Sequence, residues 1–125
     1  MNRPNARSAA LLLLRLIEAK ETKKSSSVSR FRVSDITLRR LWNRYRIEGA
    51  FVTEVSEVLL DAGWALFFTG RHYAMIKTDM VEGWVRLSSK GISEELVQVR
   101  AGAYDFKDLE RLIPSPAVDG DEDAD

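Results

Sequence analysis

The sequence contains no cysteine and a single histidine, His72. Without thiols, the chain has no disulfide and no thiolate that would bind a metal or act as a nucleophile. A lone histidine has no second histidine with which to share a metal, and we find no Gly-rich phosphate loop, nucleophile elbow or Ser/His/Asp arrangement. Because the usual catalytic sets are missing, we expect a protein that is not an enzyme and uses no cofactor or metal.

The chain also has no long apolar run. Residues 9–14 form an apolar stretch near the N-terminus, but Arg15 interrupts it. That stretch is far shorter than the roughly 20 residues that span a bilayer, and no small-residue cleavage site follows it at a suitable distance. Together with the absence of cysteine, this predicts a cytoplasmic protein without membrane contact.

What is present suffices for one hydrophobic core. Of the 125 residues, 45% are hydrophobic and 30% are charged, and the large side chains include three Trp and five Phe. This size and composition match a single folded domain. We therefore expect one mainly α domain over residues 1–113, with a small antiparallel β-hairpin or three-stranded sheet. Residues 114–125 are acidic and have little to bury, which predicts a disordered tail.

Charge is distributed unevenly along the sequence, although the net charge is zero. Residues 1–46 hold twelve Lys or Arg against three acidic residues, a charge of +9, whereas the remainder holds seven against sixteen, a charge of −9. This asymmetry favours a basic surface for a polyanion, an acidic surface or tail that competes for it, or head-to-tail self-association. The alternatives are that the two halves interleave in the fold and that the acidic tail only aids solubility.

The N-terminal region predicts a helix over about 5–22, since it is rich in helix formers and has no internal Gly or Pro. Five apolar residues share one face of this helix: Ala9, Ala10, Leu13, Leu16 and Ile17. Leu11 and Leu14 lie on the opposite side. Such a second apolar surface is either buried in a small bundle or used by a partner, so homodimerisation through this helix is one expectation.

A short strand at 31–33 precedes a helix-turn-helix over about 34–62, with Ser34 as the first N-cap. Helical spacing predicts core packing for four residues: Leu38, Leu41, Trp42 and Tyr45. The alternative for Trp42 and Tyr45 is that they stack single-stranded bases, which their spacing with Leu38 and Leu41 disfavours. The opposite side is basic and supplies the main candidates for nucleic-acid contact: Arg39, Arg40, Asn43, Arg44 and Arg46. Such side chains bind guanine, adenine and phosphate. Alternatively, these arginines pair with acidic side chains or simply face solvent.

The next helix, about 51–62, turns three carboxylates outward: Glu54, Glu57 and Asp61. Gly63 ends it, and a wing hairpin over about 64–78 follows. A two-residue turn at Gly70 and Arg71 suits type II′ and pairs Phe68 with Tyr73, so that Arg71 and His72 project from the tip. Residues 84–88 are a candidate third strand, and short helices are expected over about 93–113.

The order helix, short strand, helix, turn, helix, hairpin resembles the winged helix-turn-helix superfamily, which includes many bacterial transcription regulators. The resemblance covers roughly residues 6–77. It includes the stretch LLDAGWALFF, which runs from a helix into a strand as the third helix of that family runs into its wing. It implies that helix 51–62 enters the major groove of DNA and that Arg71 and His72 lie on a wing near the backbone or minor groove.

The sequence departs from that family at the helix expected to read DNA. Glu54, Glu57 and Asp61 would approach phosphates of like charge, and that helix has no Lys or Arg to offset them. We therefore expect the preceding basic helix and the Arg71 turn to carry the DNA contacts of a small, dimeric transcription regulator. The second hypothesis is a protein-interaction module of the same fold, which holds its partner with the acidic helix and with Leu11 and Leu14.

Overall fold

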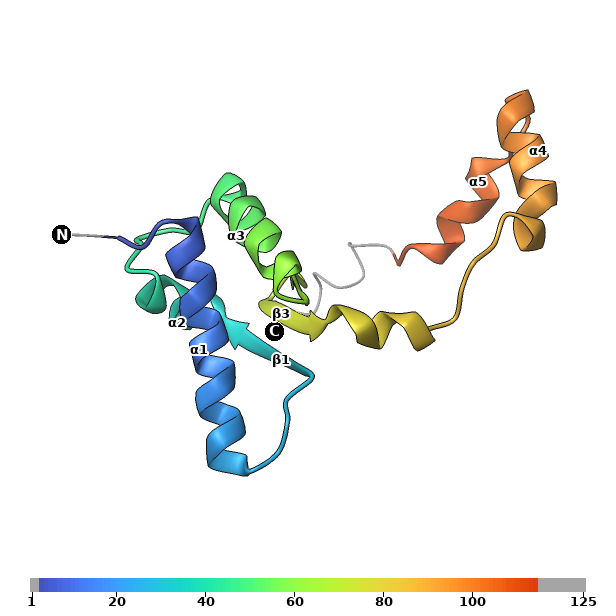
Figure 1. Cartoon of the computed structure of the whole chain (residues 1–125). Coiled ribbons are helices and arrows are strands. Elements are labelled where there is room, and N and C mark those ends of the chain that lie inside the picture. The colour runs from blue at the N-terminus through green and yellow to red at the C-terminus, as the bar shows by residue number, and fades with distance from the viewer. Residues whose placement is uncertain (1–2, 115–125) are drawn as a thin grey trace. The chain divides into compact units, whose positions relative to one another are not determined.

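The computed structural model describes residues 3–114, which fall into two compact units on either side of the bond between Trp84 and Val85 (Figure 1). The two units are described separately. Residues 115–125, which make up most of the predicted disordered tail, lie outside the described residues.

The first unit combines helices with a small three-stranded antiparallel sheet, and the fold class is the one predicted, mainly α and winged-helix-like. Its elements, in chain order, are α1 (Ala6–Lys24), β1 (Arg30–Ser34), α2 (Asp35–Leu41), α3 (Gly49–Asp61), β2 (Trp64–Phe68), β3 (His72–Lys77) and the 3₁₀ segment η1 (Thr78–Gly83). The strand order is β1-β3-β2, so the first strand pairs with the last.

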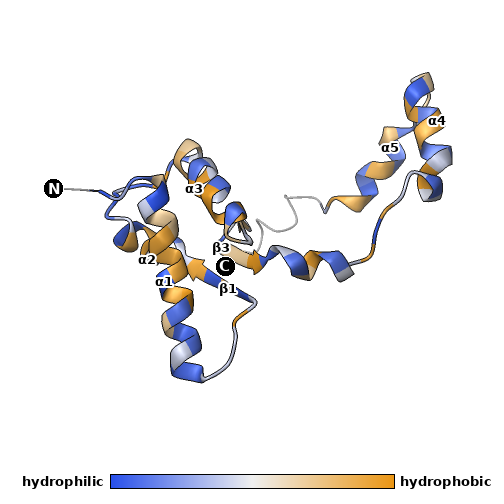
Figure 2. Cartoon of the chain, viewed as in Figure 1, coloured by the Kyte–Doolittle hydropathy of each residue, from blue (hydrophilic) through white to orange (hydrophobic). Residues whose placement is uncertain are grey.

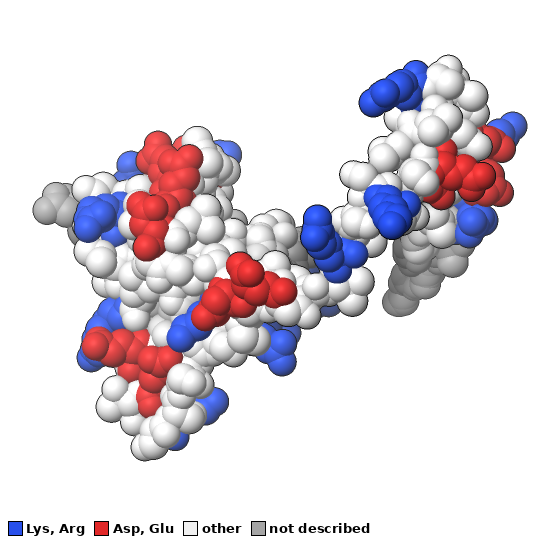
Figure 3. Space-filling view, turned by 45° about the vertical axis from the view of Figure 1, so that its right-hand side comes forward, with Lys and Arg blue, Asp and Glu red and all other residues white. Residues whose placement is uncertain are grey.

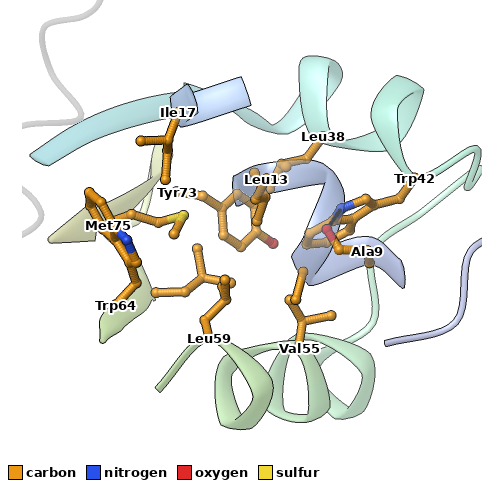
Figure 4. Close-up of a cluster of buried hydrophobic side chains, with 12 residues drawn as sticks. Ala9, Leu13, Ile17, Leu38, Trp42, Val55, Leu59, Trp64, Tyr73 and Met75 are labelled. Carbon is orange, nitrogen blue, oxygen red and sulfur yellow. Dashed lines mark hydrogen bonds between the residues drawn. The ribbon is translucent and has the colours of Figure 1, made fainter. Parts of the chain in front are cut away.

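The core of this unit lies between the helices and one face of the sheet (Figure 4). Its largest fully buried side chains come from all three helical regions and from β3: Leu13, Leu38, Trp42, Val55, Leu59 and Met75. Burying side chains of this kind contributes about 1.5–3 kcal/mol each. The Trp42 indole Nε1–H also donates a hydrogen bond of 3.2 Å to the carbonyl of Ala9, which ties the end of α2 to α1.

The hairpin has the predicted register, with Phe68 opposite Tyr73. The Thr69 N–H donates to the His72 carbonyl at 2.8 Å and closes a two-residue turn. Gly70 has a φ of 99°, as a type II′ turn requires in its first central position. The third strand is β1, predicted at 31–33, whereas residues 84–88 form no strand and that prediction is wrong.

Helix α2 ends at Leu41, earlier than the apolar spacing predicts. Asn43 adopts a left-handed φ of 52°, and the N–H groups of Asn43 and Arg44 donate to the carbonyls of Arg40 and Arg39. These two bonds form a Schellman motif, which ends the helix. Beyond it the helical register is lost and Tyr45 turns outward, with 91% of its surface exposed. The prediction that Tyr45 packs in the core is therefore wrong.

The second unit contains two short helices, α4 (Ser93–Ala101) and α5 (Phe106–Leu109), with the 3₁₀ segments η2 (Lys90–Ile92) and η3 (Glu110–Leu112). The rings of Tyr104 and Phe106 contact each other, with centroids 5.3 Å apart. No residue of the described range 85–114 is buried, although Figure 2 shows apolar residues on both helices. The short helices predicted over 93–113 are present, but they enclose no core.

Candidate functional site

Four of the predicted nucleic-acid-binding residues line one shallow hollow on the outer face of α2. The hollow has a volume of about 620 Å³. Its lining consists of Ile36, Arg39, Arg40, Asn43, Arg44 and Tyr45. Ile36, Arg39 and Arg40 follow each other at helical spacing within α2, whereas Asn43, Arg44 and Tyr45 follow the end of the helix and reach the hollow because the chain reverses after Trp42. The arginines are thus gathered partly by α2 and partly by the Schellman turn.

The arginines of this region differ in what they already bind. The Arg39 Nε donates to the Asp35 carboxylate at 2.7 Å, and its Nη1 donates to the Tyr45 carbonyl at 3.4 Å. Arg40 and Arg46 are exposed, and neither takes part in an ion pair within residues 3–114. Arg46 follows Tyr45 in the chain but does not line the hollow. Arg40 and Arg46 are therefore the guanidinium groups best placed to meet a phosphate.

Arg44 serves the fold. Its guanidinium carbon lies 3.5 Å from the centroid of the Phe51 ring, and its Nη2 donates to the carbonyl of Pro4 at 3.2 Å. The aromatic contact continues inward, since the Phe51 and Trp42 rings meet edge to face at 5.4 Å. Arg44 therefore joins the segment before α1 to the start of α3 and supports one wall of the hollow.

Tyr45 is the residue of this site that the sequence pattern misassigned. An exposed aromatic ring beside guanidinium groups is the combination with which proteins stack nucleic-acid bases. The available signal was Asn43, because Asn is the commonest residue after Gly at the left-handed position that ends a helix. A helix that is predicted to end at Asn43 does not place Tyr45 on its apolar face, so Tyr45 would have been predicted to lie outside the core.

The wing lies next to the first turn of α2. Arg71 is exposed in the turn of the hairpin, and His72, at the start of β3, pairs with Ser34, the N-cap of α2. Since α2 is only seven residues long, the wing and the far end of the hollow are separated by roughly 10 Å of helix.

Tyr73, on β3, has a perturbed acidity. Burial, and secondarily the negative charge of Asp35, raises the pKa of Tyr73 above its ordinary value of 10.0.

Helix α3 carries its three carboxylates outward, as predicted from its spacing. Glu54, Glu57 and Asp61 are all exposed, and Figure 3 shows acidic side chains gathered over α3. Leu60, between the last two of them, is 53% exposed. This face is acidic and is bordered by one exposed apolar side chain, unlike the hollow beside α2.

The second apolar surface predicted for α1 is smaller than its sequence suggests. Leu11 is 51% exposed. Leu14 is half-buried and packs against the core, as does Leu12. Only Leu11 therefore remains as a large outward apolar side chain of the predicted pair.

The formal charge differs between the parts of the chain. The first unit holds fourteen Lys or Arg against nine acidic residues, a charge of +5, whereas residues 85–114 hold five of each sign. Residues 115–125 contain five acidic residues and no basic residue. The positive charge of the protein is thus concentrated in the unit that contains the hollow and the wing.

Comparison with known proteins found no matching family model, curated protein or solved structure. Among the described residues, no helix has both the length and the apolar character needed to cross a membrane.

Proposed function

We propose that this chain is a small DNA-binding protein of the winged helix-turn-helix type that acts in transcription regulation. The observation that carries the proposal is the basic hollow, which Arg39, Arg40 and Asn43 line together with the outward-facing Tyr45. Guanidinium and amide groups bind phosphates and base edges, and the tyrosine ring offers a stacking surface. The charge of +5 on this unit supports attraction to a polyanion.

In this proposal the duplex meets the outer face of α2 and the wing. Arg40 and Arg46 bind phosphates, Asn43 and Tyr45 meet the bases or sugars, and Arg71 and His72 approach the backbone from the wing. Helix α3 faces away from the duplex, because Glu54, Glu57 and Asp61 would lie against phosphates without a compensating cation. DNA docking thus differs from the arrangement in which the third helix of a winged-helix domain enters the major groove.

Titration of duplex DNA at two salt concentrations tests the proposal. The wild type should bind with an affinity that falls steeply with salt. In a double Arg40→Ala, Arg46→Ala variant, the negative slope of log K against log salt should become shallower by about 2. The control is the double Arg7→Ala, Arg15→Ala variant, which removes the same charge from exposed positions of α1. Wild-type protein without salt-sensitive binding would refute DNA binding. Equal losses in both variants would place the contacts elsewhere.

A second pair of substitutions tests which helix faces the duplex. Replacing Glu54 and Glu57 with Gln removes negative charge from α3 while keeping the shape of the side chains. If α3 faces away, DNA affinity should change less than about threefold, as expected for charges beyond a Debye length. A rise of tenfold or more would show that α3 approaches the phosphates, and the docking proposed above would be wrong.

The other candidate function is that of a protein-interaction module. It is favoured by the exposure of Leu60 on α3, beside the row of carboxylates, since an exposed apolar side chain next to charged ones is a feature of partner surfaces. In that case the partner is basic around an apolar pocket, and Leu11 on α1 offers a further contact. Tight partner binding that Leu60→Gln abolishes, in a protein that does not bind DNA, would favour this function.

A further inference from the structure

Strand β1 lies at an edge of the sheet, and one of its two sides is unpaired. In the described part of the chain, its neighbour in the strand order is β3 alone. The Lys77 N–H donates to the Ser29 carbonyl at 2.9 Å, and this bond fixes which residues of β1 face β3. Main-chain groups alternate in direction along an antiparallel strand. Phe31 therefore bonds to β3, whereas the N–H and C=O groups of Arg30 and Arg32 point away from it.

An apolar hollow, the edge hollow, lies beside this unpaired side and has a volume of about 300 Å³. Leu16 and Ile17 of α1 line it together with Phe31 and Val33 of β1. Arg32 also lines it, although the alternation of side chains places Arg32 on the face of the sheet opposite to the core. No residue of β3 contributes to the lining. The edge hollow therefore opens on the side of β1 that is turned away from β3.

The surroundings of the edge hollow are basic. Arg30 and Arg32 are exposed, and Lys20 of α1 is exposed where it lines the edge hollow. None of these three residues forms an ion pair within residues 3–114. Glu21 follows Lys20 in α1, but its carboxylate accepts a hydrogen bond of 2.8 Å from the N–H of Val28. The charges around the edge hollow are thus complementary to an acidic ligand.

The free edge and the charges together favour a peptide over other occupants. A strand edge presents donors and acceptors in alternation, which the main chain of a peptide complements and the phosphates of DNA, which only accept, do not. A second copy of β1 is disfavoured as well. Antiparallel pairing of two copies around Phe31 would place Arg30 of each copy opposite Arg32 of the other, and like charges directly opposite each other are destabilising.

We propose that β1 binds an extended acidic peptide, which adds to the sheet as an antiparallel strand. An aliphatic side chain of the peptide lies opposite Phe31 and enters the edge hollow. Because side chains alternate between the two faces, the peptide residues before and after it lie opposite Arg30 and Arg32 on the other face. Acidic side chains at these two positions pair with the guanidinium groups. The peptide therefore has the order acidic, aliphatic, acidic, and its binding does not depend on DNA binding.

Titration of the full chain with the blocked pentapeptide Gly-Asp-Leu-Asp-Gly, from roughly 10 µM to 1 mM, tests the site, since a small contact surface implies weak association. The wild type should bind it. The matched control peptide carries an N-methyl group on each Asp. It keeps both charges and the Leu side chain but cannot donate to the carbonyls of Arg30 and Arg32, so its Kd should be about tenfold higher or more.

Hydrogen exchange separates strand addition from attraction by charge alone. In the free protein the N–H of Phe31 is protected by β3, whereas those of Arg30 and Arg32 have no partner in the sheet and should exchange quickly. The bound peptide should slow exchange at Arg30 and Arg32 about tenfold or more and should change that of Phe31 much less. This alternation along one strand is expected only if the peptide pairs with the free edge.

A charge-reversed pair provides the third test. The double Arg30→Glu, Arg32→Glu variant should bind the acidic peptide about tenfold less tightly or worse, but should bind Gly-Lys-Leu-Lys-Gly within about threefold of the wild-type affinity for the acidic peptide. Such rescue also shows that the variant is folded. The double Arg7→Glu, Arg15→Glu variant makes the same charge change elsewhere on exposed positions of α1, and it should keep the wild-type affinity within about threefold.

Three results overturn the proposal: a wild type that does not bind the acidic peptide, an N-methylated peptide that binds equally well, or exchange that is slowed at neither Arg30 nor Arg32. Two further results would assign the edge to another occupant and overturn it too. One is a wild-type dimer that the peptide dissociates. The other is a peptide affinity that rises about tenfold when the acidic residues of 115–125 are replaced by Asn and Gln in the full chain.

Discussion

The guanidinium of Arg44 lies over the ring of Phe51, with its central carbon 3.5 Å from the ring centroid. The same side chain donates a hydrogen bond to the carbonyl of Pro4, and among the described residues its buried Nε has no hydrogen-bond partner. A side chain that connects the start of the chain with α3 contributes to stability, while its charge keeps one wall of the hollow basic. The pair therefore links the fold of this unit to its proposed DNA-binding surface.

We predict that Arg44→Ala lowers the free energy of unfolding by about 1–3 kcal/mol, because it removes the contact with Phe51 and the bond to Pro4. Urea denaturation measures this change. Arg46→Ala, at an exposed neighbouring arginine, serves as the control and should change stability by less than about 0.5 kcal/mol. A double-mutant cycle with Phe51→Leu should give a coupling of about 0.5–2 kcal/mol. Zero coupling would mean that the contact contributes nothing.

Trp42 anchors the end of α2 in the core, and we expect Trp42→Phe to cost about 1–3 kcal/mol, since it removes the indole that donates to the Ala9 carbonyl and leaves a smaller ring in a fully buried site. Thermal or urea denaturation provides the measurement. Trp84→Phe is the matched control, since Trp84 is 57% exposed and the same change there should be nearly neutral. Similar losses at both positions would argue against this assignment of Trp42 to the core.

The raised pKa of Tyr73 predicts a loss of stability at high pH. Below pH 10.0 the phenol keeps its proton in both states; above it, the unfolded chain releases the proton first and becomes favoured. The free energy of unfolding should therefore fall as the pH rises from about 10 toward the higher pKa of the folded state. Tyr73→Phe should remove this part of the decline, as measured by urea denaturation between about pH 8 and 11. Tyr45→Phe, at an exposed ring, should behave as the wild type, and an unchanged decline in Tyr73→Phe would exclude Tyr73 as its source.

The wing is expected to contribute to DNA binding through charge alone. Arg71→Ala should lower the slope of log K against log salt by about 1 and leave the free energy of unfolding unchanged, since Arg71 is exposed in the hairpin turn. Gly70→Ala instead strains the positive φ of the turn and should destabilise the protein by about 1 kcal/mol. If the slope of log K against log salt is the same for Arg71→Ala as for the wild type, Arg71 and the wing do not contact DNA.

Local chemistry in the sequence determined most of the elements of the first unit. The type II′ turn at Gly70 and its register follow from the conformational freedom of glycine. The N-cap of α2 at Ser34 and the outward carboxylates of α3 likewise depend on neighbouring residues alone, so they were predictable.

Tertiary structure decided which arginines are engaged in contacts within the protein and which apolar side chains stay exposed. The residue type at Asn43 signals where α2 ends and therefore where Tyr45 leaves the apolar stripe, but only the packing of α3 and of the segment before α1 brings Phe51 and Pro4 to Arg44. The choice of β1 over residues 84–88 as the third strand depends on pairing with a segment about forty residues away. The exposure of the second unit could not be predicted from the sequence either. Its apolar residues lie on short helices, as expected, but whether they are buried depends on a second apolar surface that packs against them, which a local pattern does not reveal.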